Sequence, residues 1–392
     1  MADPLRKCLS MSGPAPLRAD GDPHEYTAWG NRSLVRRTGT TWVKLWLSWD
    51  ALQPEYEPRD RDDAFFDLTM SPGGEGWLWR LDRQVRAAND DGLGVILTLY
   101  HAHPRWATGA TGDDPASERR AAQRVPRDVS EDGPWGWLVE YLCARYTGTV
   151  NALGPRAPLP GERLSARAAR TGNPLGARVD ALEIANEPNV LLWPQAGLAR
   201  LVADMVRTAS ALSDRHRGPR ILAPSLLDSP DPDEADDPGQ RTDWRSFTEV
   251  LLDELGAFRP GRPVGWSHHN YRDVRRDPRA EESRAATVAR LLRERRWPGW
   301  DGRLWLTEGG LDLGTDADDA AARRRQAISL ERSFEEMRRL PEAFVWTHHT
   351  IHDLPGNPFR SGLRDAFRPG AGPGPARPAL SVWEALPGAP GR

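Results

Sequence analysis

Short apolar runs alternate with longer amphipathic segments along most of this 392-residue chain. A strand that is buried on both faces forms a short, nearly continuous apolar run, whereas a helix that packs on a sheet repeats its apolar residues at spacings of three and four. Regular alternation of the two is typical of βαβ units and of a parallel sheet. We predict eight strands of a (β/α)₈ TIM barrel with extended βα loops, at Lys7–Ser12, Thr41–Leu47, Gly94–Tyr100, Ala181–Ala185, Arg220–Pro224, Val264–His268, Leu304–Thr307 and Ala343–Trp346.

The segments between these runs predict the outer helices of the barrel. Their apolar positions recur with the helical period. Residues 13–38 show almost no such period, so we expect the first helix to be short or replaced. The expected helices are Trp77–Asn89, Trp135–Tyr146, Leu198–Asp214, Trp244–Phe258, Glu281–Arg296, Ala320–Leu340 and Ala379–Leu386.

Three stretches interrupt the alternation within what we expect to be a single domain over residues 1–392. Residues 153–176 are rich in Pro, Gly and Arg and precede the fourth strand, which predicts an insertion on the N-terminal face of the barrel. Residues 108–133 and 228–242 follow strands, so they belong to the face that carries catalysis in barrel enzymes. The second of these is acidic and is interpreted as a loop, with calcium binding left open.

Composition excludes several classes of function. The net charge is −3, from 53 basic and 56 acidic residues, and no basic stripe is present to bind nucleic acid. No run approaches the roughly 20 apolar residues of a membrane span, and the first residues lack a signal-like apolar core, so we expect a cytoplasmic protein. Cys8 and Cys143 are expected to be buried thiols. Seventeen tryptophans exceed the needs of the core, and indole faces suit stacking on sugar rings.

Two predicted strands each place a glutamate at their carboxyl end. The run Ala181–Asn189 reads ALEIANEPN, in which Pro188 stops the strand just after Glu187. The run Leu304–Gly310 reads LWLTEGG and ends on Glu308. Catalytic groups of barrel enzymes lie at these strand ends, so the two carboxylates should meet across the barrel mouth. Glycoside hydrolysis needs such a pair, one protonated and one ionised.

These residues resemble those of the clan A glycoside hydrolases, retaining barrel enzymes with glutamates on strands four and seven. The resemblance implies Glu187 as general acid/base and Glu308 as nucleophile, with carboxyl groups roughly 5–5.5 Å apart. It covers Thr41 to Trp346. Asn189 followed by Trp193 is similar to the β-xylosidase and α-iduronidase relatives in particular.

The same resemblance implies a set of substrate-binding residues. It implies that Tyr271 supports the nucleophile and that Trp346 forms the floor of the −1 sugar site. Independently of the resemblance, the position of Asn186 beside the acid suits a hydrogen bond to the sugar 2-hydroxyl, with a turn residue that caps its own backbone as the alternative. Lys44 stands near the place where the family often has an arginine, so the hydrogen bonding around Glu308 should differ from the family pattern. The full set is Lys44, His101, Trp106, Asn186, His269, Tyr271 and Trp346.

The resulting prediction is a hydrolase of O-glycosidic bonds, β-linked, that acts on a carbohydrate without cofactor or metal. One alternative is a metal-dependent amidohydrolase that uses the histidines at the ends of strands three, six and eight, among them the pair His101 and His103. A second alternative is a carbohydrate-binding barrel without turnover. The sugar, exo or endo attack and the oligomeric state stay open at this point.

Overall fold

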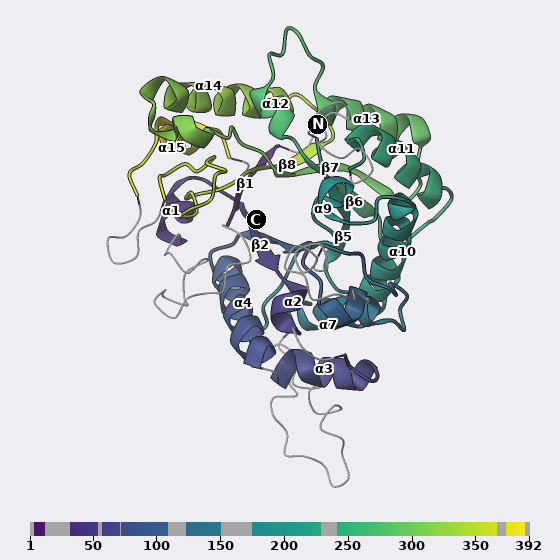
Figure 1. Cartoon of the computed structure of the whole chain (residues 1–392). Helices are drawn as coiled ribbons and strands as arrows, with labels where there is room; N and C mark the ends of the chain where they lie inside the picture. The colour runs from purple at the N-terminus through teal and green to yellow at the C-terminus, as the bar shows by residue number, and fades with distance from the viewer. Residues whose placement is uncertain are drawn as a thin grey trace.

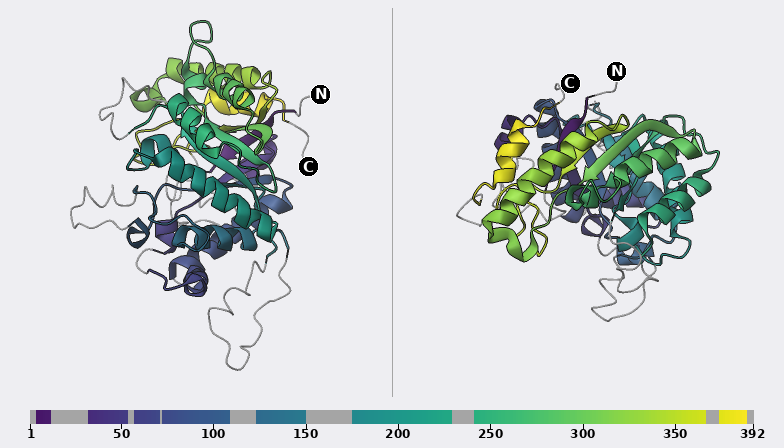
Figure 2. Two further views of the ribbon diagram at one scale, coloured as in Figure 1. Left: turned by 90° about the vertical axis from the view of Figure 1, so that its right-hand side faces the viewer. Right: turned by 90° about the horizontal axis from the view of Figure 1, so that it is seen from above.

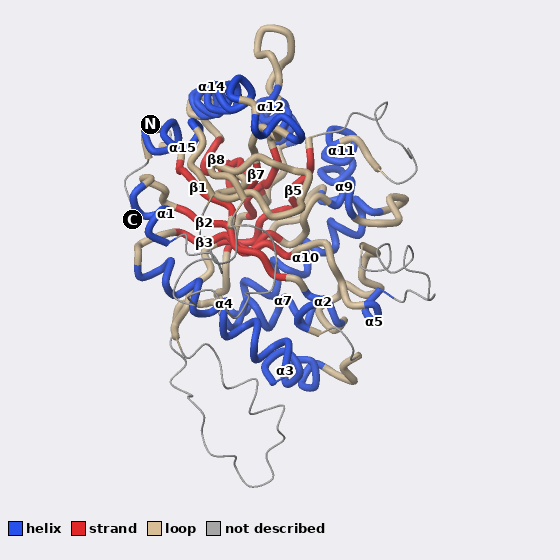
Figure 3. The backbone as a smooth tube through the Cα atoms, turned by 60° about the vertical axis from the view of Figure 1, so that its left-hand side comes forward, coloured by secondary structure: helices blue, strands red, loops and turns tan. Residues whose placement is uncertain are grey.

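The computed structural model describes residues 4–11, 32–53, 57–70, 72–108, 123–149, 175–228, 241–366 and 374–388. Eight strands, all parallel, form a closed barrel in chain order, and the last strand pairs with the first. Figure 3 shows the strands at the centre with the helices around them. The predicted fold class is confirmed. The strands are β1 (Arg6–Ser10), β2 (Trp42–Leu47), β3 (Gly94–Leu99), β4 (Ala181–Glu183), β5 (Arg220–Leu227), β6 (Val264–His269), β7 (Trp300–Glu308) and β8 (Ala343–His348).

The strand predictions identified every strand and misplaced some of the ends. β5, β7 and β8 are longer than expected, and β4 ends two residues early, at Glu183. Beyond β4, Asn186 still pairs with Ser225 through an isolated parallel bridge. This bridge keeps the Asn-Glu-Pro turn attached to the barrel next to β5.

Helices surround the barrel, as Figures 1 and 2 show. All seven predicted helices are present, and the short α1 (Arg32–Arg37) lies in the weakly periodic first connection. An unpredicted helix, α3 (Arg61–Met70), packs against two of the predicted ones. The other helices are α2 (Trp49–Leu52), α4 (Pro72–Asp90), α5 (Arg105–Thr108), α7 (Pro134–Arg145), α9 (Pro188–Leu191), α10 (Leu198–His216), α11 (Trp244–Leu255), α12 (Tyr271–Arg275), α13 (Arg284–Arg295), α14 (Ala320–Met337) and α15 (Pro378–Ala385), with a 3₁₀ helix, η2 (Gly314–Asp318).

The interior of the barrel is filled in layers, because alternate residues of each strand point inward. The lower layer is apolar and aromatic, and the rings of Trp42 and Trp305 meet edge to face with centroids 5.3 Å apart. Above it lies a buried polar layer, whose members bond one another both between neighbouring strands and across the barrel. These members are Lys44, Thr98, Glu183, Ser267 and Thr307. The carboxyl ends of the strands therefore lie above a buried ionic layer.

All three expected interruptions lie mainly outside the described residues, and of residues 108–133 only Thr108 and residues 123–133 are described. The other two are described in still smaller part. These are the insertion, of which only Leu175 and Gly176 are described, and the acidic stretch, of which Asp228, Arg241 and Thr242 are described. The Asp228 carboxylate is buried and accepts the backbone N–H of Arg272 at 2.8 Å. Cys8 and Cys143 are buried free thiols, as predicted. Within the described part of the chain, no helix is long and apolar enough to cross a membrane.

Candidate active site

Glu187 follows the carboxyl end of β4, four residues after Glu183, in an unusual backbone conformation. Its φ and ψ are 46° and 48°, the left-handed region that non-glycine residues rarely adopt. The Glu187 N–H donates to the Ser225 carbonyl at 2.8 Å, and Pro188 starts the short helix α9 immediately afterwards. The turn thus aims the Glu187 side chain into the barrel mouth at the cost of local strain.

Glu308 is the last residue of β7, and both of its oxygens are hydrogen-bonded. Lys44 Nζ donates to Oε1 at 2.8 Å, and the Tyr271 hydroxyl donates to Oε2 at 2.7 Å. Two glycines follow, and a Cβ at Gly309 would come within 2.5 Å of the Asn270 side chain. A side chain at this place would therefore require the Asn270 side chain to move.

His269, the last residue of β6, lies between the two glutamates. Its Nδ1 is 2.7 Å from Glu187 Oε1, and its Nε2 is 3.4 Å from Glu308 Oε1. A carboxylate oxygen of Glu187 and one of Glu308 lie within 4.8 Å of each other. Oxygens this close are more typical of the narrowly spaced carboxyl groups of a retaining glycosidase than of the widely spaced pair that holds a water in an inverting one. The spacing agrees with the expectation for direct attack by Glu308.

Lys44 takes a different place from the substrate contact suggested by the sequence. It is fully buried, and its ammonium lies 2.8 Å from Glu308 and 3.0 Å from Glu183. Lys44 is therefore a counterion of two carboxylates beneath the cavity. Glu183 was missed by the sequence analysis, although its position four residues before Glu187 on the same predicted strand could have drawn attention to it.

The charges of these groups set the protonation state of the site. Burial by itself would raise the pKa of Glu308, but the charges of His269 and Lys44 and the Lys44 hydrogen bond outweigh it, and the pKa lies below its ordinary value. Burial opposes the Lys44 charge, yet Glu183 and Glu308 raise its pKa. Burial and the nearby Glu308 raise the pKa of Tyr271 well above 10.0. At neutral pH Glu308 is thus ionised and Tyr271 is a donor.

The glutamates open into a cavity of about 620 Å³, a usual size for a small-molecule site. Its lining combines aromatic rings with polar groups, a combination that suits sugar faces and hydroxyls. The Asn186 Oδ1 atom is buried and has no hydrogen-bond partner among the described residues. Along with Glu187 and Glu308, the lining includes Trp46, Tyr100, His101, Asn186, Tyr271, Arg275, Asp312, His349, Asn357 and Phe359.

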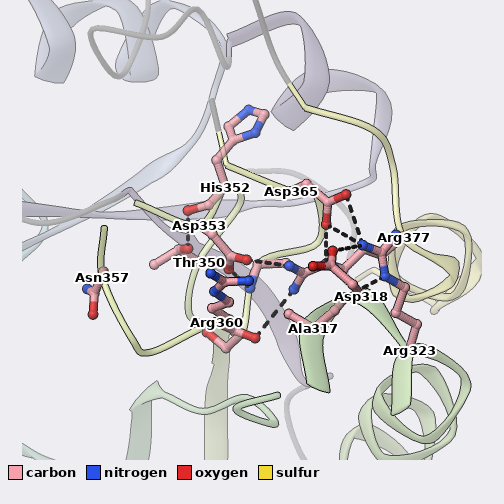
Figure 4. Close-up of polar contacts among 12 residues, drawn as sticks. Ala317, Asp318, Arg323, Thr350, His352, Asp353, Asn357, Arg360, Asp365 and Arg377 are labelled. Carbon is pink, nitrogen blue, oxygen red and sulfur yellow. Dashed lines mark hydrogen bonds and ion pairs between the residues drawn. The ribbon is translucent and has the colours of Figure 1, made fainter. Parts of the chain in front are cut away.

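One wall of the cavity comes from the long β8–α15 connection, which contributes Leu354, Asn357 and Phe359. Figure 4 shows the polar network behind this wall. Arg377, which is almost fully buried, pairs with Asp353 and, at 2.8 Å, with Asp365. Arg323 of α14 holds the other oxygen of Asp365 at 3.0 Å. These ion pairs tie the loop to the helix layer, so the wall is preorganised.

The prediction that Trp346 forms the floor of the sugar site is wrong. Trp346 is fully buried and stacks on Trp383 of α15 with ring centroids 5.6 Å apart, on the outer side of β8. Trp46 and His349 supply aromatic rings in the cavity instead. Trp106 also lies away from this lining, because its indole N–H donates to the Gln53 carbonyl at 3.0 Å and its ring packs edge-on against Trp49.

The histidines at the strand ends do not converge on one point. His101 lines the cavity, whereas His103 Nδ1 lies 2.9 Å from the Arg124 carbonyl. His348 Nε2 lies 3.0 Å from the Ser361 carbonyl, and burial lowers the pKa of His348 to about 3. Glu187, His269 and Glu308 each offer one ligand atom within 4.8 Å, but the Lys44 ammonium already contacts Glu308. A site without metal remains our prediction.

Comparisons with known proteins support the fold. No protein-family model and no curated protein matches the chain. Among solved structures, Fpglu1 from Fervidobacterium pennivoraus matches with a TM-score of 0.54 at 10% identity, covering 98% of this chain and 94% of that one. The β-glycosidase BGL167 matches with a TM-score of 0.50 at 14% identity, covering 97% and 95%.

A third structure adds a named ligand. The GH5_18 protein from Streptomyces cattleya, solved in complex with GlcNAc, matches with a TM-score of 0.50 at 14% identity, covering 100% of this chain and 83% of that one. At these identities the similarity establishes a shared barrel fold, and function has to be argued from the site.

Proposed function

We propose that this protein is a retaining glycoside hydrolase, with Glu187 as general acid/base and Glu308 as nucleophile. The observation that carries the proposal is the pair of carboxylates at the ends of β4 and β7, whose oxygens approach within 4.8 Å at the base of an open cavity. Carboxylate oxygens this close favour direct attack by one carboxylate over attack by a water held between two more widely spaced carboxyl groups. The barrel fold shared with the β-glycosidase BGL167 is consistent with it.

In the first step Glu308 attacks the anomeric carbon of the sugar and forms a covalent glycosyl ester, while the bond to the leaving oxygen breaks. Glu187 donates its proton to that oxygen. Tyr271 and Lys44 hold the two Glu308 oxygens at 2.7 and 2.8 Å, so the nucleophile is ionised and fixed in orientation. Because these two donors are already in place before the reaction, they need to move little as it proceeds.

In the second step Glu187 acts as a base. It takes a proton from water, the resulting oxygen attacks the anomeric carbon, and the ester bond to Glu308 breaks. His269 Nδ1 lies 2.7 Å from Glu187 Oε1. Because an imidazole nitrogen can donate or accept, this contact supports Glu187 in both of its protonation states.

The substrate class follows from the cavity lining. The buried Asn186 Oδ1 lacks a partner among the described residues, and a sugar hydroxyl placed beside the nucleophile would satisfy it. Trp46 and Tyr100 offer aromatic surface for the C–H face of a sugar ring. We therefore propose a carbohydrate substrate with a β-linked O-glycosidic bond.

A panel of aryl β-glycosides tests the proposal, with xylosides, glucosides, mannosides and galactosides side by side. Aryl alcohol release in the presence of a chelator is the expected result, and the Glu308→Gln variant should release none. A 2-deoxy-2-fluoro glycoside with an activated leaving group should label the peptide that contains Glu308. Binding of sugars without turnover across the panel would instead support a carbohydrate-binding barrel.

A further inference from the structure

Glu183 is a buried carboxylate that the mechanism above does not use. It is the last residue of β4, four residues before Glu187, and its side chain has no exposed surface. An ionised carboxylate in such a place is strongly destabilising unless it is paired and hydrogen-bonded. A buried carboxylate directly beneath the proposed catalytic residues therefore suggests a role in the site.

Every oxygen of Glu183 is occupied. Thr98 donates to Oε2 at 2.8 Å, Thr307 donates to Oε1 at 2.7 Å, and Ser267 also donates to Oε1. Lys44 completes the set at 3.0 Å from Oε2. Three hydroxyls from three different strands therefore hold Glu183 in one orientation, with one cation as its direct ion-pair partner.

Lys44 shares its charge between two anions. Its ammonium donates to Glu308 at 2.8 Å, lies 3.0 Å from Glu183, and is 3.5 Å from His269 Nε2. Other titratable groups face this cluster from the surrounding strands: Cys8 on β1 and His349 after β8 interact electrostatically with it, and Tyr271 bonds Glu308. Burial would drive the proton from Lys44, and the two carboxylates oppose this loss.

We propose that Glu183 is a positioning residue of the hydrolysis proposed above, and that it holds the Lys44 ammonium charged and aimed at the nucleophile Glu308. The inference rests on the proposed function. Without Glu183, Lys44 would have Glu308 as its one carboxylate partner, and formation of the glycosyl ester would remove even that charge. With Glu183, the cation keeps a fixed counterion through both steps, so it can return to Glu308 when the ester is hydrolysed.

This arrangement predicts opposite effects for the two buried charges. Glu183, Lys44 and Glu308 together carry one net negative charge when all are ionised. In Glu183→Gln the Lys44 ammonium keeps Glu308 as a carboxylate partner and should stay charged at acidic pH, because ester formation has not yet removed that partner. Loss of the negative charge of Glu183 then makes Glu308 harder to protonate, so the acid limb of kcat/KM should move to lower pH. Removing the positive charge of Lys44 makes Glu308 easier to protonate, so the limb should move to higher pH, by about 1 to 3 units for a direct partner.

The test compares the pH profiles of kcat/KM for the full-length wild type, Glu183→Gln, Lys44→Met and the double variant. The expected order of the acid limb is Glu183→Gln lowest, Lys44→Met highest, and the double variant between them. Compared with Lys44→Met, Lys44→Arg should bring kcat/KM and the position of its acid limb closer to those of the wild type. A purely structural role for Glu183 would lower activity in every variant without this order, and that result would overturn the proposal.

Two further measurements separate this inference from the proposed function. The titration of the Glu308 carboxyl carbon, followed by NMR and assigned by its loss in Glu308→Gln, should shift in the same order even if no glycoside is hydrolysed. Glu140→Gln serves as the matched control, because Glu140 is also buried and ion-paired, with Arg61, but belongs to α7 in the helix layer. An equal limb shift in Glu140→Gln, or an unshifted Glu308 titration in Glu183→Gln, would contradict the inference.

Discussion

Tyr271 and Glu308 are joined by a hydrogen bond of 2.7 Å from the phenol to Oε2. Tyr271 is the first residue of the short helix α12, two residues after His269, which contacts the other glutamate. The end of β6 and the start of α12 thus supply a partner to each member of the proposed catalytic pair. The chemistry of the site depends on this segment as much as on the glutamates themselves.

The first prediction removes that phenol. In Tyr271→Phe the carboxylate loses a donor worth about 1.5–3 kcal/mol, so kcat should fall by about 10 to 100-fold. The pKa of Glu308 lies below its ordinary value, and loss of a donor to the ionised form raises it. Activity is present above this pKa, so the acid limb of kcat/KM should move to higher pH.

Tyr146→Phe is the matched control for this variant. The Tyr146 hydroxyl also donates to a carboxylate, Asp82, at 2.8 Å, but it lies in the helix layer. We expect Tyr146→Phe to lower the free energy of unfolding and to leave the pH profile in place. An unshifted profile in Tyr271→Phe would show that the phenol does not act on the nucleophile.

The second prediction separates the two glutamates by their products. In Glu187→Ala, a substrate with an activated leaving group should still form the glycosyl ester, which accumulates as a burst. Azide needs no general base, so it should restore turnover and give the β-glycosyl azide. In Glu308→Ala azide would attack from the opposite face and give the α-product. If Glu187→Ala gave the α-azide and Glu308→Ala the β-azide, the roles of Glu187 and Glu308 would be exchanged.

The third prediction contrasts two tryptophans. Trp346→Ala should lower the free energy of unfolding by about 3–5 kcal/mol, because it empties a buried space against Trp383. Its kcat/KM per folded molecule should change by less than about threefold, equivalent to under 1 kcal/mol. Trp46→Ala should lower kcat/KM by about tenfold or more through lost contact with the sugar ring. Chemical denaturation measures the stability of the two variants, and initial rates measure their kcat/KM. An equal fall in kcat/KM for Trp346→Ala and Trp46→Ala would argue against a sugar that contacts Trp46 and not Trp346.

The fourth prediction concerns the left-handed backbone of Glu187. Alanine is strained at φ 46°, whereas glycine adopts this region freely. Glu187→Gly should therefore be more stable to unfolding than Glu187→Ala, by about 1 kcal/mol. Urea denaturation of the two variants measures the difference. Greater stability of the alanine variant would mean that the turn relaxes out of this conformation.

The fifth prediction tests the wall formed by the β8–α15 connection. Arg377→Met leaves Asp353 buried beside an apolar side chain, which should cost about 3–5 kcal/mol of stability. We also expect KM to rise more than kcat falls, because Asn357 and Phe359 line the cavity from this loop. Arg338→Met is the control, because it removes a surface ion pair with Glu335 at the end of α14. It should leave the free energy of unfolding and KM nearly unchanged. A fall in kcat alone would point to an effect on the glutamates.

Much of the barrel could be predicted from the sequence because its strands and helices each have a characteristic local pattern of apolar residues. Buried strands appear as apolar runs, and helices repeat at their own period. The strand ends then determine which residues reach the catalytic face, so Glu187 and Glu308 could be identified before any contact was known. The end of β4 was less predictable, because a single bridge between Asn186 and Ser225 continues the pairing beyond Glu183.

The sequence by itself determined the order of the strands and the delivery of both glutamates to one end of the barrel. The tertiary structure alone decided which face of each strand looks inward. Parallel strands are apolar on both faces, so nothing in β8 distinguishes the outward Trp346 from the inward residues beside it. The sharing of Lys44 between Glu183 and Glu308 was likewise decided only in three dimensions, because closing the barrel is what brings β2, β4 and β7 around one ammonium group.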